Sequence, residues 1–294
     1  MALGASPRRV ARSIVTESLV LAVAGGTARA TLEDGPHCRN ANGAMNMVAL
    51  GILADQVLAA AVRTAAPSGV RLGTTHLHLQ FTGAAAIGDI KATSLLLGNR
   101  EGATLRQSLS SGTLYAQSKP ICHAGGEFML LDPPPGVTLG PLPWEREPPS
   151  IVPVDIGQLE PHEGAIIQAC DAALAKASPQ ASFIQHFWGG ALRHNRQGAS
   201  NRLVIGQHIG NRVGHVQGGV LLGLAATTAC AAAPAAMMLS NMSVWYISAG
   251  RGDILRIRSR RLHSGRTTVV VRTEVKTANG ERVLEAVSHH VACK

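Results

Sequence analysis

Aromatic and charged residues are both scarce in this sequence of 294 residues: Phe, Trp and Tyr make up 3% of the chain, and Asp, Glu, Lys and Arg make up 15%. The low charge excludes a disordered chain and a charged coiled coil, while 46% apolar residues are ample for a hydrophobic core. Because rings are so few, small residues, among them 32 glycines, have to provide close backbone packing.

Cysteine is also rare, and acidic residues are fewer than basic ones. The five cysteines are an odd number, widely spaced and without a C-x-x-C pair. This pattern argues against a disulfide framework or a zinc ribbon and favours a reduced, cytoplasmic compartment. The 27 Lys and Arg residues outnumber the 18 Asp and Glu residues, which favours an anionic partner such as nucleic acid, an acidic lipid or a phosphorylated cofactor.

An internal repeat organises the chain. Residues 40–55 (NANGAMNMVALGILAD) align with residues 211–226 (NRVGHVQGGVLLGLAA), and residues 81–92 (FTGAAAIGDIKA) align with residues 245–256 (WYISAGRGDILR). The offsets are 171 and 164 residues, so the copies differ by a short length change in the loop between the blocks. Two units of one fold are therefore predicted, in line with the roughly two domains that the length suggests.

Each unit is expected to contain a β-rich lead-in, one apolar helix of small residues and then antiparallel strands. The lead-ins are expected over 13–33 and 182–209, and the helices over 45–64 and 217–231. The expected strands are 72–83, 88–98, 103–117 and 120–131 in the first copy, and 240–248, 252–263, 267–278 and 281–292 in the second. An extra helix is expected over 159–177. The predicted organisation is a first domain at 1–131, a proline-rich linker at 132–158 and a second domain at 159–294.

One uncharged segment, residues 216–250, is long enough to span a bilayer. Its counterpart in the first copy carries Asp55 and Arg63, so the fold does not need this position to lie in lipid. A helix that is apolar on every side can instead be wrapped by a curved sheet. No membrane span is expected.

The start of each helix carries parts of one motif, N-x-x-G-x-x-(H/Q)-G-G, followed by an acid. The residues that fit it are Asn40, Gly43 and Asp55 in the first copy, and Asn211, Gly214, Gln217, Gly218 and Gly219 in the second. With this motif the sequence resembles the hotdog fold and, more narrowly, the phenylacetate-pathway type of acyl-CoA thioesterase. The resemblance implies an α+β chain of two tandem hotdog domains, a double hotdog, each a curved antiparallel sheet wrapped around a central apolar helix.

Neither copy of the motif is intact. In the first copy Met47 and Val48 stand where the family has Gly-Gly, and Asn46 stands at the His position. In the second copy Ala226 stands where the family has the acid. Each copy lacks what the other retains.

In the family, two units pair and each active site takes its acid from one unit and its helix-terminal glycine from the other. The resemblance therefore implies one composite site, with Asp55 as general base or nucleophile and the Gly218 N–H as oxyanion donor. Gly219 would let the thioester approach closely, and Gln217 and Asn211 would orient the thioester or the water. The opposite pairing lacks these groups, which predicts one working site per chain.

Ordinary structural roles stay open for the same residues. An acid on a partly buried helix is commonly paired with an arginine, here Arg63 or Arg71, and Asn211 is an ordinary residue at a helix approach. His215 lies two residues before the family's His position and is expected to line a loop. The remaining histidine pairs lack a third ligand at metal spacing, so no metal site is expected.

For the arginines, too, both a substrate-binding role and an ordinary surface position are open. Arg251 and Arg266 lie at expected turns, where they could bind the phosphates of coenzyme A. Arg256, Arg258 and Arg260 recur at every second residue, on one face of a strand, and are expected to be solvated. Basic residues are not interleaved with stacking aromatics, so nucleic acid is not expected as a partner.

The predicted function is hydrolysis of an acyl-CoA thioester to free acid and CoA, with CoA as part of the substrate and no separate cofactor. The alternative is an inactive acyl-CoA-binding or assembly protein. A hotdog hydratase would need a D-x-N-P-x-H block, which the sequence lacks. A homodimer of the tandem chain is compatible with the resemblance. The acyl pocket is expected to be lined by flexible apolar residues: Met45, Met47, Leu50, Met237 and Met238.

Overall fold

The computed structural model describes residues 19–67, 69–101, 106–139, 159–211 and 213–293. Its helices are α2 (Met47–Arg63), α3 (Pro161–Lys176), α4 (Phe183–Phe187), the 3₁₀ helix η4 (Gln207–Ile209) and α5 (Gly218–Ala232). The strands of the first half are β1 (Leu19–Ala24), β2 (Thr27–Leu32), β3 (Arg71–Phe81), β4 (Ile90–Glu101), β5 (Arg106–Ala116) and β6 (Lys119–Leu131). Those of the second half are β7 (Arg193–Asn195), β8 (Gly198–Val204), β9 (Met237–Tyr246), β10 (Ile254–Ser264), β11 (Thr268–Thr277) and β12 (Arg282–Ala292).

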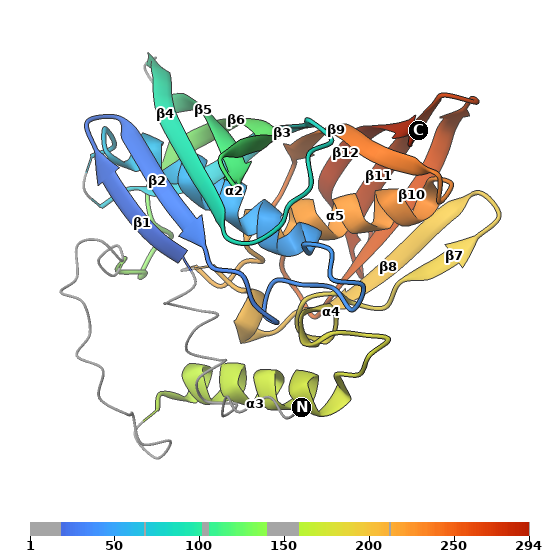
Figure 1. Ribbon diagram of the computed structural model, residues 1–294. Helices are drawn as coiled ribbons and strands as arrows, with labels where there is room; N and C mark the ends of the chain where they lie inside the picture. The colour runs from blue at the N-terminus through green and yellow to red at the C-terminus, as the bar shows by residue number, and fades with distance from the viewer. Residues whose placement is uncertain (1–18, 68, 102–105, 140–158, 212, 294) are drawn as a thin grey trace.

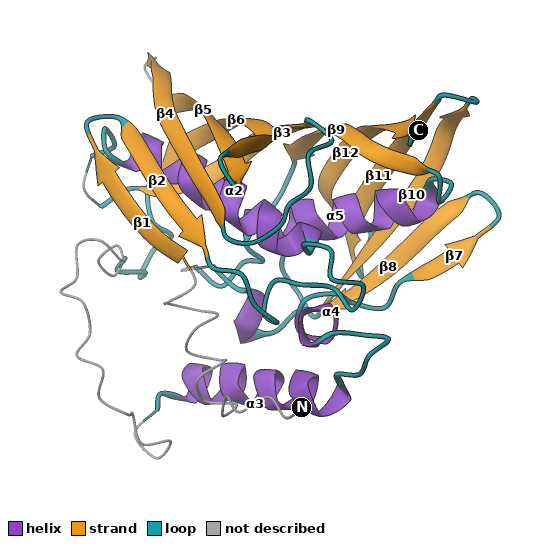
Figure 2. Cartoon of the chain, in the orientation of Figure 1, coloured by secondary structure: helices purple, strands orange, loops and turns teal. Residues whose placement is uncertain are grey.

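All of these strands belong to one antiparallel sheet with the order β1-β2-β4-β5-β6-β3-β9-β12-β11-β10-β8-β7. Each half has the same strand order read from its outer edge, and the halves meet where β3 pairs with β9, from His76↔Trp245 to Gln80↔Asn241. The sheet curves around α2 and α5, which follow one another along its concave side (Figures 1 and 2). A curved sheet around a central helix, formed twice, is the predicted architecture.

The internal repeat is visible in the turn before each central helix. The backbone N–H of Asn40 and that of Asn211 each donate to the carbonyl four residues further on, at 2.8 Å and 2.7 Å. Gly43 and Gly214 have φ angles of +78° and +75°, a left-handed conformation that favours glycine. The two copies of the motif therefore form the same turn.

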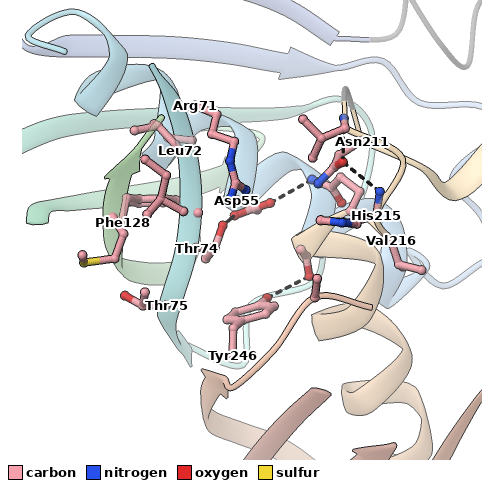
Figure 3. Close-up of a pocket in the computed structure, with 18 of the residues that line it drawn as sticks. Asp55, Arg71, Leu72, Thr74, Thr75, Phe128, Asn211, His215, Val216 and Tyr246 are labelled. Carbon is pink, nitrogen blue, oxygen red and sulfur yellow. Dashed lines mark hydrogen bonds between the residues drawn. The ribbon is translucent and has the colours of Figure 1, made fainter. Parts of the chain in front are cut away.

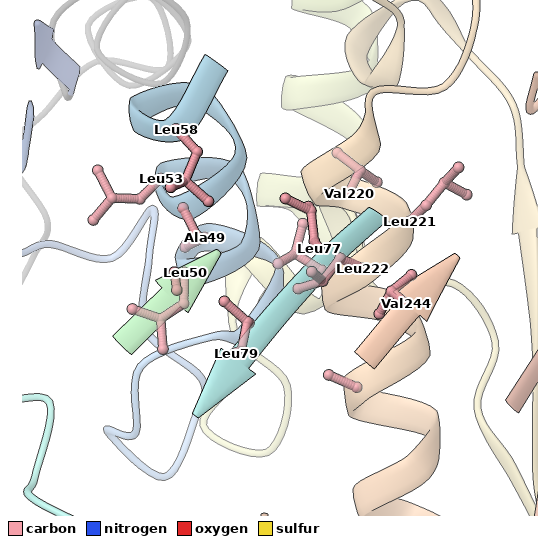
Figure 4. Close-up of a cluster of buried hydrophobic side chains, with 14 of the residues drawn as sticks. Ala49, Leu50, Leu53, Leu58, Leu77, Leu79, Val220, Leu221, Leu222 and Val244 are labelled. Atoms are coloured by element: carbon pink, nitrogen blue, oxygen red, sulfur yellow. The ribbon is translucent and has the colours of Figure 1, made fainter. Parts of the chain in front are cut away.

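Small residues let α2 and α5 approach closely. A Cβ at Gly51 would lie 2.5 Å from the carbonyl oxygen of Gly219, and a Cβ at Gly223 would lie 2.3 Å from the Cα of Val48. Backbone contact thus replaces large rings at the centre of the molecule, as the composition indicated. Aliphatic side chains of the two helices and of β3 and β9 surround this contact (Figure 4): Leu50, Leu53, Leu77, Leu79, Leu222 and Val244.

The predicted central helices, the eight predicted strands and the extra helix α3 are confirmed to within a few residues. One prediction was wrong: residues 183–187, part of the expected second lead-in, form the helix α4. Ser182 and Gln185 form a capping box, and Phe183, Ile184 and Phe187 are buried in a cluster with residues of α3. This local helix signal outweighed the β-rich composition around it.

Parts of three predictions lie outside the described residues: 13–18 of the first lead-in, 103–105 of a strand and 140–158 of the linker. In the part of the chain that the structure describes, none of the helices combines the length and hydropathy needed to cross a membrane.

Candidate active site

A cleft of about 620 Å³ lies at the seam between the two halves. The first half lines it with residues of α2, β3 and β6, and the second half lines it with residues at 210–218 and 246–250. Figure 3 shows Asp55 and Thr74 on the side of the first half, His215 on the side of the second, and Tyr246 between them.

Asp55 of α2 lies in the wall of this cleft and is only 5% exposed. Its Oδ2 accepts hydrogen bonds from the Nε2 of Gln217 at 2.8 Å and from the backbone N–H of Gly219 at 3.1 Å. Its Oδ1 accepts one from the hydroxyl of Thr74 at 3.0 Å. The acid of the first half is thus held by donors at the helix start of the second half.

Burial raises the pKa of Asp55 to about 6, because removal from water disfavours the carboxylate. The hydrogen bonds from Thr74 and Gly219 oppose this increase. Within the described residues Asp55 forms no ion pair. Arg71 instead donates its Nε to the carbonyl of Asp132, and Arg63 donates to the carbonyl of Val70. The expected alternative, an acid paired with one of these arginines, is not found in the described residues.

Gln217 links the carboxylate to the start of α5. It is the N-cap residue, and its Oε1 accepts the backbone N–H of Val220 at 2.9 Å. This bond fixes the amide so that its Nε2 is directed at Asp55. The capping geometry therefore orients the group that contacts the acid.

Gly218, the first residue of α5, lines the cleft beside Asp55. A Cβ here would lie 3.0 Å from Oδ2 of Asp55 and 3.3 Å from the hydroxyl oxygen of Thr74. The missing side chain keeps the space beside the carboxylate open. The N–H of Gly218 belongs to the first turn, which lacks intrahelical acceptors, and no acceptor for it occurs among the described residues.

Gly219 has a different place from the one that the sequence suggested. Its N–H is bonded to Asp55, and a Cβ would lie 2.4 Å from the carbonyl oxygen of Gly51 in α2. This residue therefore allows the two helices to touch and holds the acid, and it is not among the residues that line the cleft.

Asn211 lines the cleft, but its side chain is engaged in its own loop. Its Oδ1 accepts the backbone N–H groups of Val213 and His215 at 3.0 Å and 3.1 Å. No hydrogen bond joins it to Asp55 in the described residues. Its geometry is that of a residue that shapes the loop, the ordinary alternative left open by the sequence.

His215 lines the cleft, as expected for a loop residue. Burial lowers its pKa, and the positive charges of Arg71 and Arg251 lower it further. The positive charges of two arginines, one from each half, are therefore felt at His215 in the cleft wall.

Only one of the two arginines expected near the substrate is close to the cleft. Arg251 follows the lining residue Gly250, and its Nη2 is 3.6 Å from a carboxylate oxygen of Glu281. Arg266 lies in the turn beyond the far end of β10, and a strand of this length spans roughly 30 Å. The structure does not bring Arg266 to the cleft. Three arginines alternate along the exposed face of β10, as expected: Arg256, Arg258 and Arg260.

The residues expected to line the acyl pocket do not line this cleft. Met47 is eight residues before Asp55 on α2, about 12 Å along the helix axis, and Met45 precedes the helix. The apolar residues that the first half contributes instead come from α2, β3, β6 and the segment after β6: Ala59, Ala60, Leu72, Phe128, Met129, Leu131 and Leu139. The second half adds apolar residues of its own: Val213, Val216, Leu221, Ile247 and Ala249.

Two residues of the site, Thr74 and Tyr246, were not predicted. The hydroxyl of Tyr246 donates to the carbonyl of Gly218 at 2.8 Å, and burial, reinforced by the charge of Asp55, raises its pKa well above the ordinary value. In the strand register, Tyr246 pairs with Leu284 as Phe81 pairs with Cys122 in the first half. The repeat therefore contained a signal for Tyr246, because its hydroxyl has no counterpart on Phe81. The sequence had no comparable signal for Thr74.

A second site, with the acid from the second unit and the helix start from the first, would lack the groups that surround Asp55. Ala226, at the position of Asp55, is fully buried in α5, and Met47 stands at the position of Gly218. In the register of the strands, Thr74 pairs with Phe128 directly before a bulge, and Leu239 pairs with His290 at the same place in the second half. Leu239 therefore replaces Thr74.

Comparison with known families and structures agrees with this architecture. The sequence model of the thioesterase superfamily matches residues 214–284, from the turn before α5 into β12. The comparison with curated proteins gives no match.

Several solved structures cover almost the whole chain. The TesB protein of Mycobacterium avium subspecies paratuberculosis has 15% identity and a TM-score of 0.55, with 99% of this chain and 100% of that chain covered. The 12:0-ACP thioesterase of Umbellularia californica has 9% identity and a TM-score of 0.54, with 92% and 95% covered. A protein with the hot dog fold from Alicyclobacillus acidocaldarius has 12% identity and a TM-score of 0.53, with 94% and 96% covered.

At these identities the structural likeness establishes the fold, and the family match supports the predicted enzyme class, a thioesterase. The chain folds as a double hotdog, and residues 214–284 of its second unit match the sequence model of the thioesterase superfamily.

Proposed function

We propose that the chain hydrolyses an acyl-CoA thioester to a free acid and CoA at one composite site in the cleft between its two units. One observation carries the proposal: the buried carboxylate of Asp55 from the first unit is bonded to Gln217 and Gly219 at the helix start of the second. Thioester hydrolysis needs a base or nucleophile and a donor for the oxyanion. In this cleft the carboxylate of Asp55 and the first residue of α5, Gly218, lie side by side.

Asp55 is suited to act as a general base. The two oxygens of a carboxylate offer about four lone-pair positions, and three are filled by Thr74, Gln217 and Gly219. The position that remains, on Oδ1, can accept a proton from a water molecule. Since burial raises its pKa to about 6, Asp55 is ionised at neutral pH and still basic enough to take that proton.

The N–H of Gly218 is suited to bind the oxyanion. In the proposed step, the water oxygen bonds to the acyl carbon while Asp55 takes the proton of the water. The C–S bond then breaks, Asp55 returns the proton to the leaving sulfur, and CoA leaves as the free thiol. If Asp55 attacks the carbonyl itself, the C–S bond breaks and the CoA thiolate leaves. The acyl group is then held on Asp55 as a mixed anhydride, which water hydrolyses.

The cleft walls support a CoA thioester as substrate. Arg71 lines the cleft and Arg251 lies beside it, so two cations are available for the phosphates of CoA. The apolar residues of α2, β3 and β6 offer a surface for the acyl chain.

Hydrolysis of a panel of acyl-CoAs, followed by detection of the free thiol, tests the proposal. Asp55→Asn is the decisive variant, because the Asn carbonyl can accept from Gln217 and Gly219 while its amide donates to the hydroxyl of Thr74. We expect kcat to fall by about 10²–10⁴.

Unchanged activity of Asp55→Asn would reject the site. Tight binding of acyl-CoA without turnover by the unchanged chain would favour the non-enzymatic alternative.

A further inference from the structure

Tyr246, Gly218 and Gly219 form a chain of hydrogen bonds that ends on Asp55. The hydroxyl of Tyr246 donates to the carbonyl oxygen of Gly218 at 2.8 Å. The N–H of the same peptide unit, on Gly219, donates to Oδ2 of Asp55 at 3.1 Å. The phenol and the carboxylate are thus joined through one peptide group.

A peptide unit is planar and delocalised, so a donor at its oxygen increases the positive character of its N–H. Hydrogen bonds in series strengthen one another by perhaps 10–30% for each bond. The carbonyl has a second lone pair for the helix's own hydrogen bond, so the phenol does not compete with α5. The bond from Tyr246 therefore strengthens the bond from Gly219 to the carboxylate.

The surroundings of Asp55 make this chain of bonds important. Thr74 on β3 and Gln217 at the start of α5 are neutral donors, and Tyr246 on β9 stays protonated because burial raises its pKa well above the ordinary value. The charged or titratable groups that share the cleft are Arg63, Arg71 and His215. In the described residues none of these three forms a hydrogen bond or ion pair with Asp55.

We propose that Tyr246 is a positioning residue that holds the Gly218–Gly219 peptide against Asp55 and thereby keeps this carboxyl more acidic than burial alone would leave it. Two successive glycines give this peptide no side chain to restrict its rotation, and the phenol adds a contact to those that the peptide makes within α5. The inference rests on the proposed function only where it concerns the rate of hydrolysis.

Titration of Asp55 in the folded protein tests the proposal directly. The chain has seven aspartates, so aspartate-selective ¹³C labelling gives few carboxyl signals, and Asp55→Asn assigns one of them to Asp55. In Tyr246→Phe, which removes only the hydroxyl, the titration midpoint of Asp55 should rise by a few tenths of a pH unit. Tyr115→Phe, at the only other tyrosine, should leave the midpoint where it is. An unchanged midpoint in Tyr246→Phe overturns the proposal.

A second experiment tests the same chain of hydrogen bonds without the Tyr246→Phe variant. Incorporation of 3-fluorotyrosine makes the phenol a stronger donor without removing any contact, so the midpoint should fall. A rise or no change on fluorination contradicts the proposed chain of bonds.

The rate provides an independent readout. The acid limb of kcat/KM in Tyr246→Phe should move upward with the midpoint, so that the loss of rate is largest near pH 5–6 and smallest near pH 8. A loss by the same factor at every pH, with the midpoint unmoved, would show that Tyr246 acts on the substrate instead. If the unchanged chain hydrolyses no acyl-CoA, the proposed function fails, and the titration still decides the role of Tyr246.

Discussion

At the scale of single residues, the defining feature of this protein is a buried carboxylate held by neutral donors. Asp55 is surrounded by a hydroxyl, an amide and a backbone N–H, and no cation of the described residues is paired with it. Neutral donors satisfy its oxygens without compensating its charge, so burial dominates and the pKa rises. The two predictions at this scale follow from that increase.

Activity should decrease as the pH falls through about 6, since a general base acts only when it is deprotonated. Between pH 5 and 9, kcat/KM should therefore rise as a single group, Asp55, loses its proton. It should reach a plateau above neutrality. A rate that stays constant from pH 5 to 8 would show that Asp55 does not act as the base.

Stability should change in the opposite direction. Because the pKa of Asp55 is raised to about 6 in the folded chain, above its unfolded value of 3.8, the folded state holds a proton that the unfolded state has lost between these values. The free energy of unfolding therefore decreases as the pH rises through this window, by on the order of 3 kcal/mol for this group.

Asp55→Asn removes this contribution and should unfold at higher urea concentration than the unchanged chain at pH 8, with a smaller difference at pH 4. Asp171→Asn, an exposed aspartate of α3, is the matched control and should show no such difference. Lower stability of Asp55→Asn at pH 8 contradicts the argument.

At the scale of elements, α5 starts with two glycines, and each position requires glycine for a different reason. Gly218 leaves space beside Asp55, and Gly219 leaves space for the backbone of α2. Adjacent and chemically identical residues should therefore respond differently to the same substitution.

Gly218→Ala places a methyl group 3.0 Å from Oδ2 of Asp55, where the reacting groups would lie. We expect turnover to fall at least about tenfold, with a free energy of unfolding within about 1 kcal/mol of the original, since Ala favours a helix. Gly219→Ala meets the backbone of Gly51 at 2.4 Å and should cost about 1–3 kcal/mol or more. Urea unfolding and turnover of both variants check this contrast, and equal loss of stability contradicts it.

At the scale of the whole molecule, the pairing of β3 with β9 makes one continuous sheet and brings the acid of one unit to the helix start of the other. The reverse arrangement has Met47, Ala226 and Leu239 at the corresponding positions. Each unit therefore supplies the groups that the other lacks, and they meet at one site.

A non-hydrolysable acyl-CoA thioether should bind at one site per chain. Ala226→Asp should not add a second site, because Met47 has a side chain where Gly218 has none, and because Leu239 cannot donate a hydrogen bond. Isothermal titration calorimetry measures the stoichiometry, and two equivalent sites per chain would contradict the prediction.

Much of the fold could be predicted from local sequence. Strands and helices follow hydrophobic periodicity and turn residues, which act over a few positions. The two copies of the motif supplied the repeat, and their complementary losses pointed to Asp55 and Gly218. The same reasoning missed α4, whose capping box and three apolar residues lie in a β-rich stretch.

The sequence by itself determined the two units, the central helices and the residues that each copy had kept, because these depend on spacing along one segment. Only the tertiary structure decided that Thr74 reaches the acid, that Tyr246 reaches the carbonyl of Gly218, that Gly219 touches α2 and that Arg266 lies away from the cleft. These relations depend on which strands pair and how closely two helices approach. Such contacts join residues far apart in the chain, and no local pattern encodes them.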